Sequence, residues 1–143
     1  MNSKYRALPL ILIVTALLGS IAYAAPKTPK PLAVSKIKRG GQKPQQLSAS
    51  VAGLDSITLT AVGYSWGQAT WGTPVLIDAK GAKTRLVDLK PVSVRVGWGT
   101  FSVNHGPNGK PLVIGGTKIP HGLFAHANSA VVYKLSGKYV RFE

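Results

Sequence analysis

Two of the three histidines in the chain stand five residues apart, in the segment HGLFAHANS at 121–129. Histidine nitrogens bind metals and carry protons, so His121 and His126 are the first candidates for chemistry. On a strand, side chains five residues apart point to opposite faces, and no nearby carboxylate completes a facial triad. Asn128 and Ser129 are poor zinc ligands. We therefore expect neither a metal ion nor any other cofactor here.

A second candidate is the segment GYSWG at 63–67, which matches the G-x-S-x-G pattern around a hydrolase nucleophile, here Ser65. Asp78 or Asp88, and then a histidine, follow in the chain order of the α/β-hydrolases. In those enzymes the nucleophile turn leads straight into a helix, and residues 68–74 cannot supply one. A Ser65 hydrolase therefore stays only as a remote alternative.

Charged residues argue against most other catalytic classes. The chain has 18 Lys and Arg against four Asp and Glu, a formal net charge of +14. Glycoside cleavage needs two carboxylates at a set separation, which four scattered acids on a basic chain do not suggest. There is no cysteine, so thiol nucleophiles, thiolate zinc sites, c-type haem and disulfides are excluded. We expect that the protein is not an enzyme.

Aromatic residues remain as the chemistry-bearing group. Trp66, Trp71 and Trp98 are each followed by glycine. A flat aromatic face stacks on the C–H side of a sugar ring, while a few polar groups at its edge bind the hydroxyls. The same tryptophans could instead be core residues of a small sandwich. The sequence leaves this choice open for Trp66 and Trp71.

Short strands must position these residues. Alternating or continuous apolar runs predict strands at 57–61, 75–77, 92–96 and 112–114. Val131, Tyr133 and Leu135 share one parity, and Ser136-Gly137 predicts a tight turn that pairs them with 139–142 as a hairpin. No window has a 3.6-residue apolar period of helical length. The pattern is typical of an all-β sandwich or barrel.

The N-terminus predicts export. Lys4 and Arg6 precede an apolar run at 8–21, and Ala22-Tyr23-Ala24 is a small-x-small cleavage site, so residues 1–24 read as a signal peptide. The apolar run has about 14 residues, short of the roughly 20 that span a bilayer. We expect a secreted or periplasmic protein that meets a membrane only through this peptide.

A basic, proline-rich linker follows at 25–46. Six cations and four prolines lie between Pro26 and Pro44, with no acid and no aromatic residue. This composition predicts a solvated, extended tether. An alternative function is that the tether holds an envelope protein to anionic polymer. The cations beyond it form no cluster typical of a specific nucleic-acid interface.

From Leu86 onward the sequence resembles the NPCBM family of carbohydrate-binding modules, which are attached to some glycoside hydrolases. The family's features occur in order: L-x-D-L at 86–89, G-W-G at 97–99, Lys110-Pro111-Leu112, Gly115-Gly116, and G-x-x-x-H-A-x-S at 122–129. Residues 86–143 are therefore expected to be the N-terminal part of such a domain. Residues 47–85 form an upstream β segment without a resemblance of their own.

The resemblance implies a galactose-binding-like β-sandwich, or jelly roll, and a glycan or polysaccharide partner. It implies that Trp98 stacks on the sugar and His126 hydrogen-bonds to it, with His121 and Asn128 as further contacts. His126 could instead anchor the backbone.

The family pattern continues beyond the last residues of this chain. We therefore expect a fragment of a larger secreted protein, and one candidate for the missing C-terminal partner is a catalytic domain. In that case Tyr133, Leu135 and Val140 would lack an opposing sheet.

Glycan binding should survive removal of residues 26–44 if the folded part carries the site. It should also survive salt on the order of 0.5 M, where the Debye length is only a few ångströms. A tether that binds anionic polymer would instead lose affinity steeply with salt. Affinity electrophoresis of the full chain, the deletion variant, and a variant with the six linker cations changed to Gln separates the two functions.

Overall fold

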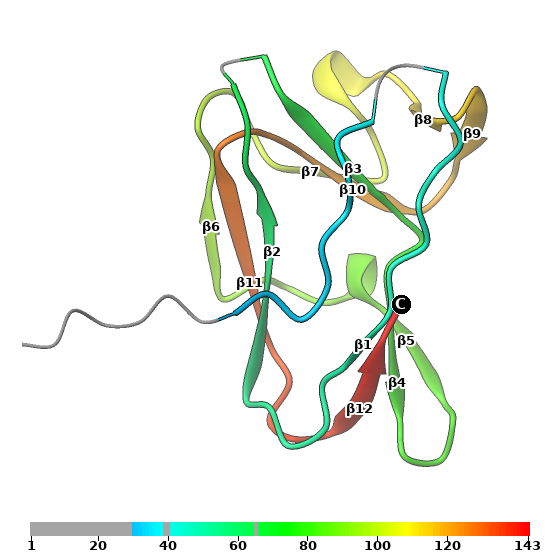
Figure 1. Cartoon of the computed structure of the whole chain (residues 1–143), viewed down its shortest axis with the longest axis vertical. Coiled ribbons are helices and arrows are strands. Elements are labelled where there is room, and N and C mark those ends of the chain that lie inside the picture. Colours follow the sequence, from blue (N-terminus) through cyan, green and yellow to red (C-terminus); the bar gives the residue numbers. More distant parts are fainter. Residues whose placement is uncertain (1–29, 39–40, 65) are drawn as a thin grey trace, which may run out of the picture. The chain divides into compact units, whose positions relative to one another are not determined.

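The computed structural model describes residues 30–38, 41–64 and 66–143, so the predicted signal peptide and Ser65 lie outside the described residues. Lys30 is counted with an N-terminal unit, and residues 31–143 form one compact unit that holds every strand described below. Within the described residues there are strands and two single-turn 3-10 helices but no α-helix (Figure 1). The predicted all-β class is confirmed. No helix in these ranges is long and apolar enough to cross a membrane.

The strands are short. Their bounds are β1 Ala49–Ser50, β2 Ser56–Ala61, β3 Gln68–Gly72, β4 Val75–Asp78, β5 Lys83–Arg85, β6 Ser93–Arg95, β7 Ser102–Val103, β8 Leu112–Ile114, β9 Thr117–Ile119, β10 Gly122–His126, β11 Ser129–Lys134 and β12 Tyr139–Phe142. The 3-10 turns are η1 Leu86–Asp88 and η2 Pro107–Gly109. The four strands predicted at 57–61, 75–77, 92–96 and 112–114 are present, three of them with small differences at their ends, and the two strands of the predicted hairpin are present as β11 and β12.

All pairings are antiparallel and form four sheets. Their strand orders are β1-β12-β4-β5, β3-β10-β7, β2-β11-β6 and β8-β9. Strands from the upstream segment pair with strands from the later segment in the three larger sheets, so residues 47–85 and 86–143 build one fold. Each strand of the sheet β2-β11-β6 is next in the chain to a strand of the sheet β3-β10-β7: β2 to β3, β11 to β10, and β6 to β7. The strands of the two sheets run in different directions in Figure 1.

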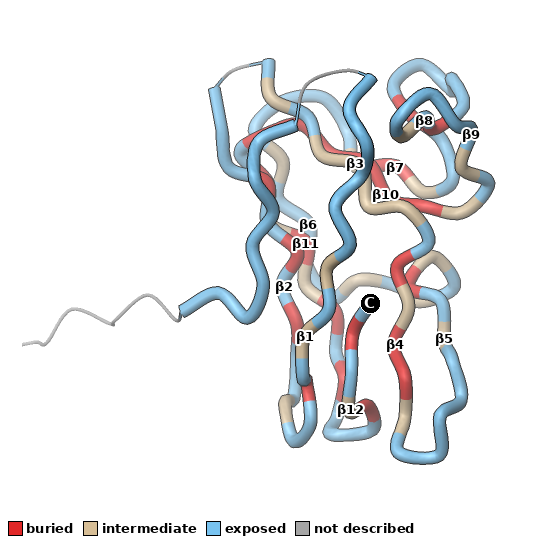
Figure 2. The backbone as a smooth tube through the Cα atoms, turned by 45° about the vertical axis from the view of Figure 1, so that its right-hand side comes forward, coloured by how far each residue is buried: buried red, intermediate tan, exposed pale blue. Residues whose placement is uncertain are grey.

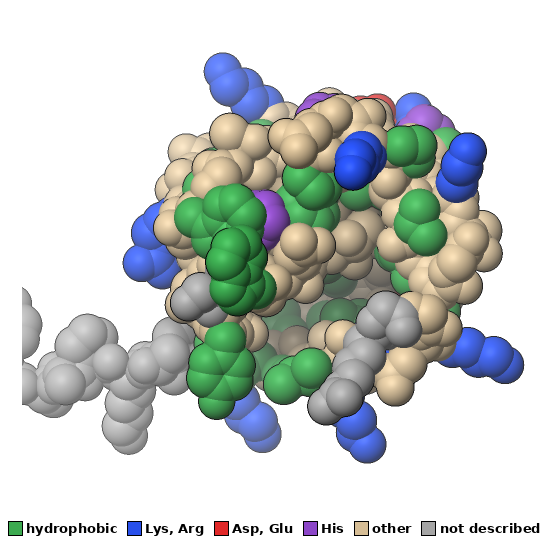
Figure 3. Space-filling view, turned by 90° about the horizontal axis from the view of Figure 1, so that it is seen from above, with side chains coloured by type: hydrophobic (Ala, Val, Ile, Leu, Met, Phe, Trp, Pro, Cys, Tyr) green, Lys and Arg blue, Asp and Glu red, His purple; other side chains and the backbone are tan. Residues whose placement is uncertain are grey.

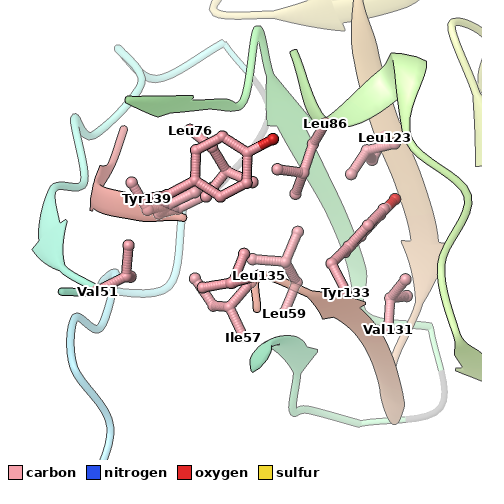
Figure 4. Close-up of a cluster of buried hydrophobic side chains, with 11 residues drawn as sticks. Val51, Ile57, Leu59, Leu76, Leu86, Leu123, Val131, Tyr133, Leu135 and Tyr139 are labelled. Atoms are coloured by element: carbon pink, nitrogen blue, oxygen red, sulfur yellow. The ribbon is translucent and has the colours of Figure 1, made fainter. Parts of the chain in front are cut away.

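The core lies between these sheets. On β2 and β11 every second residue is buried, as expected for strands with one face inward. The buried cluster joins residues of three sheets (Figure 4): Val51, Ile57, Leu59, Leu76, Leu86, Leu123, Val131, Tyr133, Leu135, Tyr139 and Phe142. β10 is buried at all five positions, which explains why it lacks the alternation that would have predicted it as a strand.

The predicted hairpin between the strands at 131–135 and 139–142 is wrong. The tight turn exists, since the Lys138 N–H donates to the Leu135 carbonyl at 3.0 Å. However, the N–H groups of Leu135 and Ser136 donate to the Asp55 carbonyl, at 2.7 and 3.1 Å. These bonds hold the turn on the segment before β2, so β12 crosses over and pairs with β1 and β4.

The expectation that inward residues lack an opposing sheet is also wrong. Tyr133 and Leu135 are 1% and 2% exposed, inside the shared core. Val140 is half-buried, and its carbonyl accepts a hydrogen bond from the Val51 N–H at 3.0 Å. The upstream strand β4, which the resemblance did not cover, pairs with β12 and adds Leu76 to the cluster.

The described part of the linker has no regular secondary structure and is exposed throughout, pale blue in Figure 2. Its last residues approach the β8–β9 turn. A Cβ at Gly115, in the β8–β9 turn, would lie 3.2 Å from Cδ of Pro44 and 3.3 Å from the Gln42 carbonyl oxygen. The predicted tether is thus solvated, but its last residues run beside this turn.

Tyr133 offers a test of the core. Its hydroxyl is buried, has no hydrogen-bond partner among the described residues, and lies among apolar side chains in Figure 4. Burial raises the pKa of Tyr133 to about 12 from its ordinary 10.0. The neutral phenol therefore stabilises the fold fully below pH 10, and this contribution is lost as the pH rises through 12.

We expect Tyr133→Phe to be as stable as the parent chain or more stable at pH 9, because it removes an unsatisfied polar group. At pH 11.5 the variant should gain about 2 kcal/mol further over the parent. Urea unfolding at both pH values measures the difference, in which the titration of other groups cancels. A gap that does not widen with pH would contradict the buried hydroxyl.

Candidate functional site

The candidate site lies at the corner between the sheets β2-β11-β6 and β3-β10-β7. β10 and β11 are joined by two residues, Ala127 and Asn128, whereas β2 and β3 are joined by residues 62–67. Because β2 pairs with β11 and β3 with β10 right up to these connections, six residues on one side face two on the other. The surplus must project from the corner as a loop.

Hydrogen bonds hold this loop at both ends. The Ala127 N–H donates to the Gly67 carbonyl at 2.9 Å, and the Gly63 N–H donates to Oδ1 of Asn128 at 3.0 Å. Within the loop the Gly67 N–H donates to the Tyr64 carbonyl at 2.7 Å. Asn128, predicted as a sugar contact, thus has its side-chain oxygen engaged in positioning the loop.

Glycines allow both flanking loops to approach the corner. A Cβ at Gly67 would lie 3.1 Å from Cβ of Ala127, and one at Gly63 would lie 3.7 Å from it. On the other side, a Cβ at Gly97 would lie 2.5 Å from both the Ala127 oxygen and the Asn128 nitrogen. Gly67 and Gly97, the first glycine of GWG, are therefore packing requirements at this corner, whereas a Cβ at Gly63 would make only an ordinary van der Waals contact.

The two loops bring aromatic side chains together. Tyr64 and Trp66 are 93% and 82% exposed, and Trp98 is 44% exposed. The rings of Trp66 and Trp98 meet edge to face, with centroids 5.7 Å apart and planes at 76°. Figure 3 shows hydrophobic side chains gathered beside a histidine at one side of this face, with Lys and Arg projecting around the rim.

His126 is the buried partner of this group. It is 3% exposed, and its ring stacks on Trp98 with centroids 3.7 Å apart and planes at 28°. Phe124 meets the same ring edge-on at 5.0 Å. A Cβ at Gly99 would lie 3.0 Å from Cδ2 of His126, so glycine leaves room for the imidazole. Its Nδ1 is buried and has no hydrogen-bond partner in the described part of the chain.

The structure therefore brings the predicted pair, Trp98 and His126, into direct contact. The contact is between the rings themselves, so His126 covers one face of the Trp98 indole. A ligand that stacks on aromatic surface at this corner has Trp66 as the more exposed indole, and Trp98 contributes its uncovered part.

A hollow of about 230 Å³ opens beside the stacked rings. Its lining combines two aromatic rings, the imidazole and three uncharged polar side chains: Gln68, Trp98, Gly99, Thr100, Pro107, Asn108, Phe124 and His126. Sequence reasoning missed Gln68, Thr100, Asn108 and Phe124. Only Phe124 carried a signal, since it is two residues before His126 and so shares its face of a strand.

His121 lies elsewhere. Its Nε2 is 3.1 Å from Nη1 of Arg85, whose Nε donates to Asp88 at 2.8 Å. Guanidinium only donates, so Nε2 of His121 accepts in this pair. The two histidines of the segment 121–129 thus contact different residues: His121 contacts Arg85, and His126 contacts Trp98. Among the residues with described positions, no three His, Cys, Asp or Glu side chains gather where they could hold a metal ion.

The sequence left open whether Trp66 and Trp71 are core residues, and their burial answers this question. Trp71, on β3, is partly buried and packs against the core, whereas Trp66 is exposed. Ser65 itself lies outside the described residues. The segment that follows it, Gln68–Gly72, is a strand and not the helix that a hydrolase nucleophile turn requires.

Comparison with known proteins gives one match. The family model described as NPCBM/NEW2 domain matches residues 82–143, which confirms the resemblance and begins four residues before Leu86. Trp98, Phe124 and His126 fall inside the matched segment, and the loop 62–67 falls before it. No curated protein and no solved structure matches the chain.

Gly97→Ala tests the corner. The added Cβ meets two backbone atoms, so the loop after β6 must shift, and we expect a loss of about 1–3 kcal/mol in unfolding free energy. The near-ultraviolet circular dichroism of the stacked Trp98 should weaken in the folded state. Gly63→Ala, whose Cβ has only an ordinary contact, is the matched control and should change stability by less than about 0.5 kcal/mol. Equal stability of both variants would contradict the close approach.

Proposed function

We propose that the protein is an exported, non-catalytic carbohydrate-binding module whose binding surface is the aromatic corner. The observation that carries this proposal is that the exposed Trp66 meets Trp98 edge to face, and that Trp98 lines a hollow with uncharged polar side chains. The match of residues 82–143 to the NPCBM/NEW2 domain supports the ligand class. The N-terminal sequence pattern supports export.

The chemistry of the corner suits a sugar ring. Indole faces offer apolar area for the C–H side of a pyranose, and adjoining exposed aromatic side chains such as Trp66 and Trp98 are typical of an interaction surface. Gln68, Thr100 and Asn108 offer amide and hydroxyl groups that both donate and accept, as ring hydroxyls do. A hollow of about 230 Å³ is small for a whole ligand, so the sugar would lie partly on the surface beside Trp66.

The positions of the acids support a binding role without catalysis. Asp55, Asp88 and Glu143 pair with Lys134, Arg85 and Arg141. Asp78 accepts hydrogen bonds from the backbone N–H groups of Lys80 and Ala82. None of these carboxylates lines the hollow. Glycoside hydrolysis needs two of them there.

Trp66→Ala should lower glycan affinity about tenfold and leave the melting temperature unchanged, because the side chain is exposed and stacking on one indole amounts to about 1.4 kcal/mol. Trp98→Ala should lower affinity at least as much and also disturb His126. Titration calorimetry with the tightest binder from an array of neutral and charged glycans gives the affinities. Val92→Ala removes a comparably exposed apolar side chain away from the corner and serves as the control. Unchanged affinity in both tryptophan variants would refute the aromatic corner as the binding surface.

A further inference from the structure

We infer that the glycan is anionic and that its charged group binds in a second hollow, across the loop 104–110 from the aromatic corner. This inference rests on the proposed function and specifies the chemical class of its ligand. The second hollow measures about 530 Å³. Its lining mixes one lysine, one histidine and apolar side chains: Asn104, His105, Gly109, Pro111, Lys118, Ile119 and Pro120.

The two hollows share one wall. Asn108 lines the aromatic hollow and Gly109 lines the second, and consecutive Cα atoms are only about 3.8 Å apart. One short oligosaccharide that stacks at Trp98 can therefore extend over this wall. No Lys, Arg, Asp or Glu side chain of the described residues lines the aromatic hollow, whereas Lys118 lines the second, so the second hollow is the one that offers a complement to an anionic group.

The wall is held in place by its hydrogen bonds. The Gly106 N–H donates to the Lys110 carbonyl at 2.7 Å, which closes the loop around η2. At its start, the Asn104 N–H donates to the Gly122 carbonyl at 2.8 Å, and the Gly122 N–H donates to Oδ1 of Asn104 at 3.2 Å. The reciprocal pair fixes the loop to β10, the strand that carries His126. Both hollows are thus positioned by the same strand.

The second hollow has the chemistry for an acidic sugar. Pro111, Ile119 and Pro120 provide apolar walls for a ring, and the Lys118 ammonium provides a charge for a carboxylate or sulfate. Nδ1 of His105 lies 2.9 Å from the Gly106 carbonyl, so Nδ1 carries the hydrogen in this bond. Nε2 of His105 is then the nitrogen left to hydrogen-bond a sugar hydroxyl.

No acid of the described chain competes for Lys118. All four carboxylates are engaged, in ion pairs with other residues or in the turn at Asp78. From Leu47 to Glu143 the sequence has ten Lys and Arg against four Asp and Glu, a formal charge of +6. An anionic ligand therefore meets an attractive field from the folded part itself, apart from the linker.

The test compares charged and uncharged forms of the same polymer with the full chain. Oligogalacturonate against its methyl ester tests a carboxylate, and dextran sulfate oligomers against dextran test a sulfate. We expect the charged member of at least one pair to bind about tenfold more tightly. Lys118→Gln should remove most of that preference and leave the affinity for the neutral member unchanged.

Lys83→Gln is the matched control, since it removes the same charge from β5, which Figure 1 places at the far end of the unit from β8 and β9. It should lower the affinity for the charged polymer by less than about twofold. Equal losses in the two variants, or no preference for the charged members, would overturn the second hollow. If Trp66→Ala still lowered the affinity for the neutral member about tenfold in that case, the proposed function would stand without this inference. Thermal melts of all variants confirm that they remain folded.

Discussion

The close packing of two loops against Ala127 and Asn128 is the constraint on which the site depends. At this corner the backbone passes from β10 to β11 with only two residues, and both flanking loops approach it to distances that exclude a side chain at Gly97. The pairing of β2 with β11 ends before Gly63, and Oδ1 of Asn128 accepts the hydrogen bond of the Gly63 N–H in place of a backbone carbonyl. Without this approach, the two loops that carry Trp66 and Trp98 would lie farther apart and the two rings would not meet.

The strands β10 and β11, which lead into the corner, are anchored in the core. β10 and β11 are central strands in their sheets, and Leu123, Val131 and Tyr133 fix them to the buried cluster. His126 is the last residue of β10, and its ring stacks on Trp98 beyond the core. Loops that are hydrogen-bonded and packed against the junction of two central strands lose less conformational entropy on ligand binding than loops without such contacts.

Charge and aromatic surface are divided between different parts of the fold. The acids are neutralised at strand ends and turns, in the pairs that include Arg85, Lys134 and Arg141. The aromatic hollow holds uncharged polar groups, and the hollow beside β8 and β9 holds Lys118. In the binding mode that we propose, this division means that stacking and charge act on different parts of one extended ligand.

The sequence by itself determined the all-β class and most strand positions, and it named Trp98 and His126, which the fold brings into contact, because alternation and ordered motifs are local properties. It did not reveal β10, whose complete burial removes the alternation, nor the crossover of β12, which depends on N–H groups taken by Asp55. Only the tertiary structure separated His121 from His126, placed Trp66 outside and Trp71 against the core, and added Gln68 to the site. These outcomes depend on contacts between residues far apart in the chain, which no local pattern encodes.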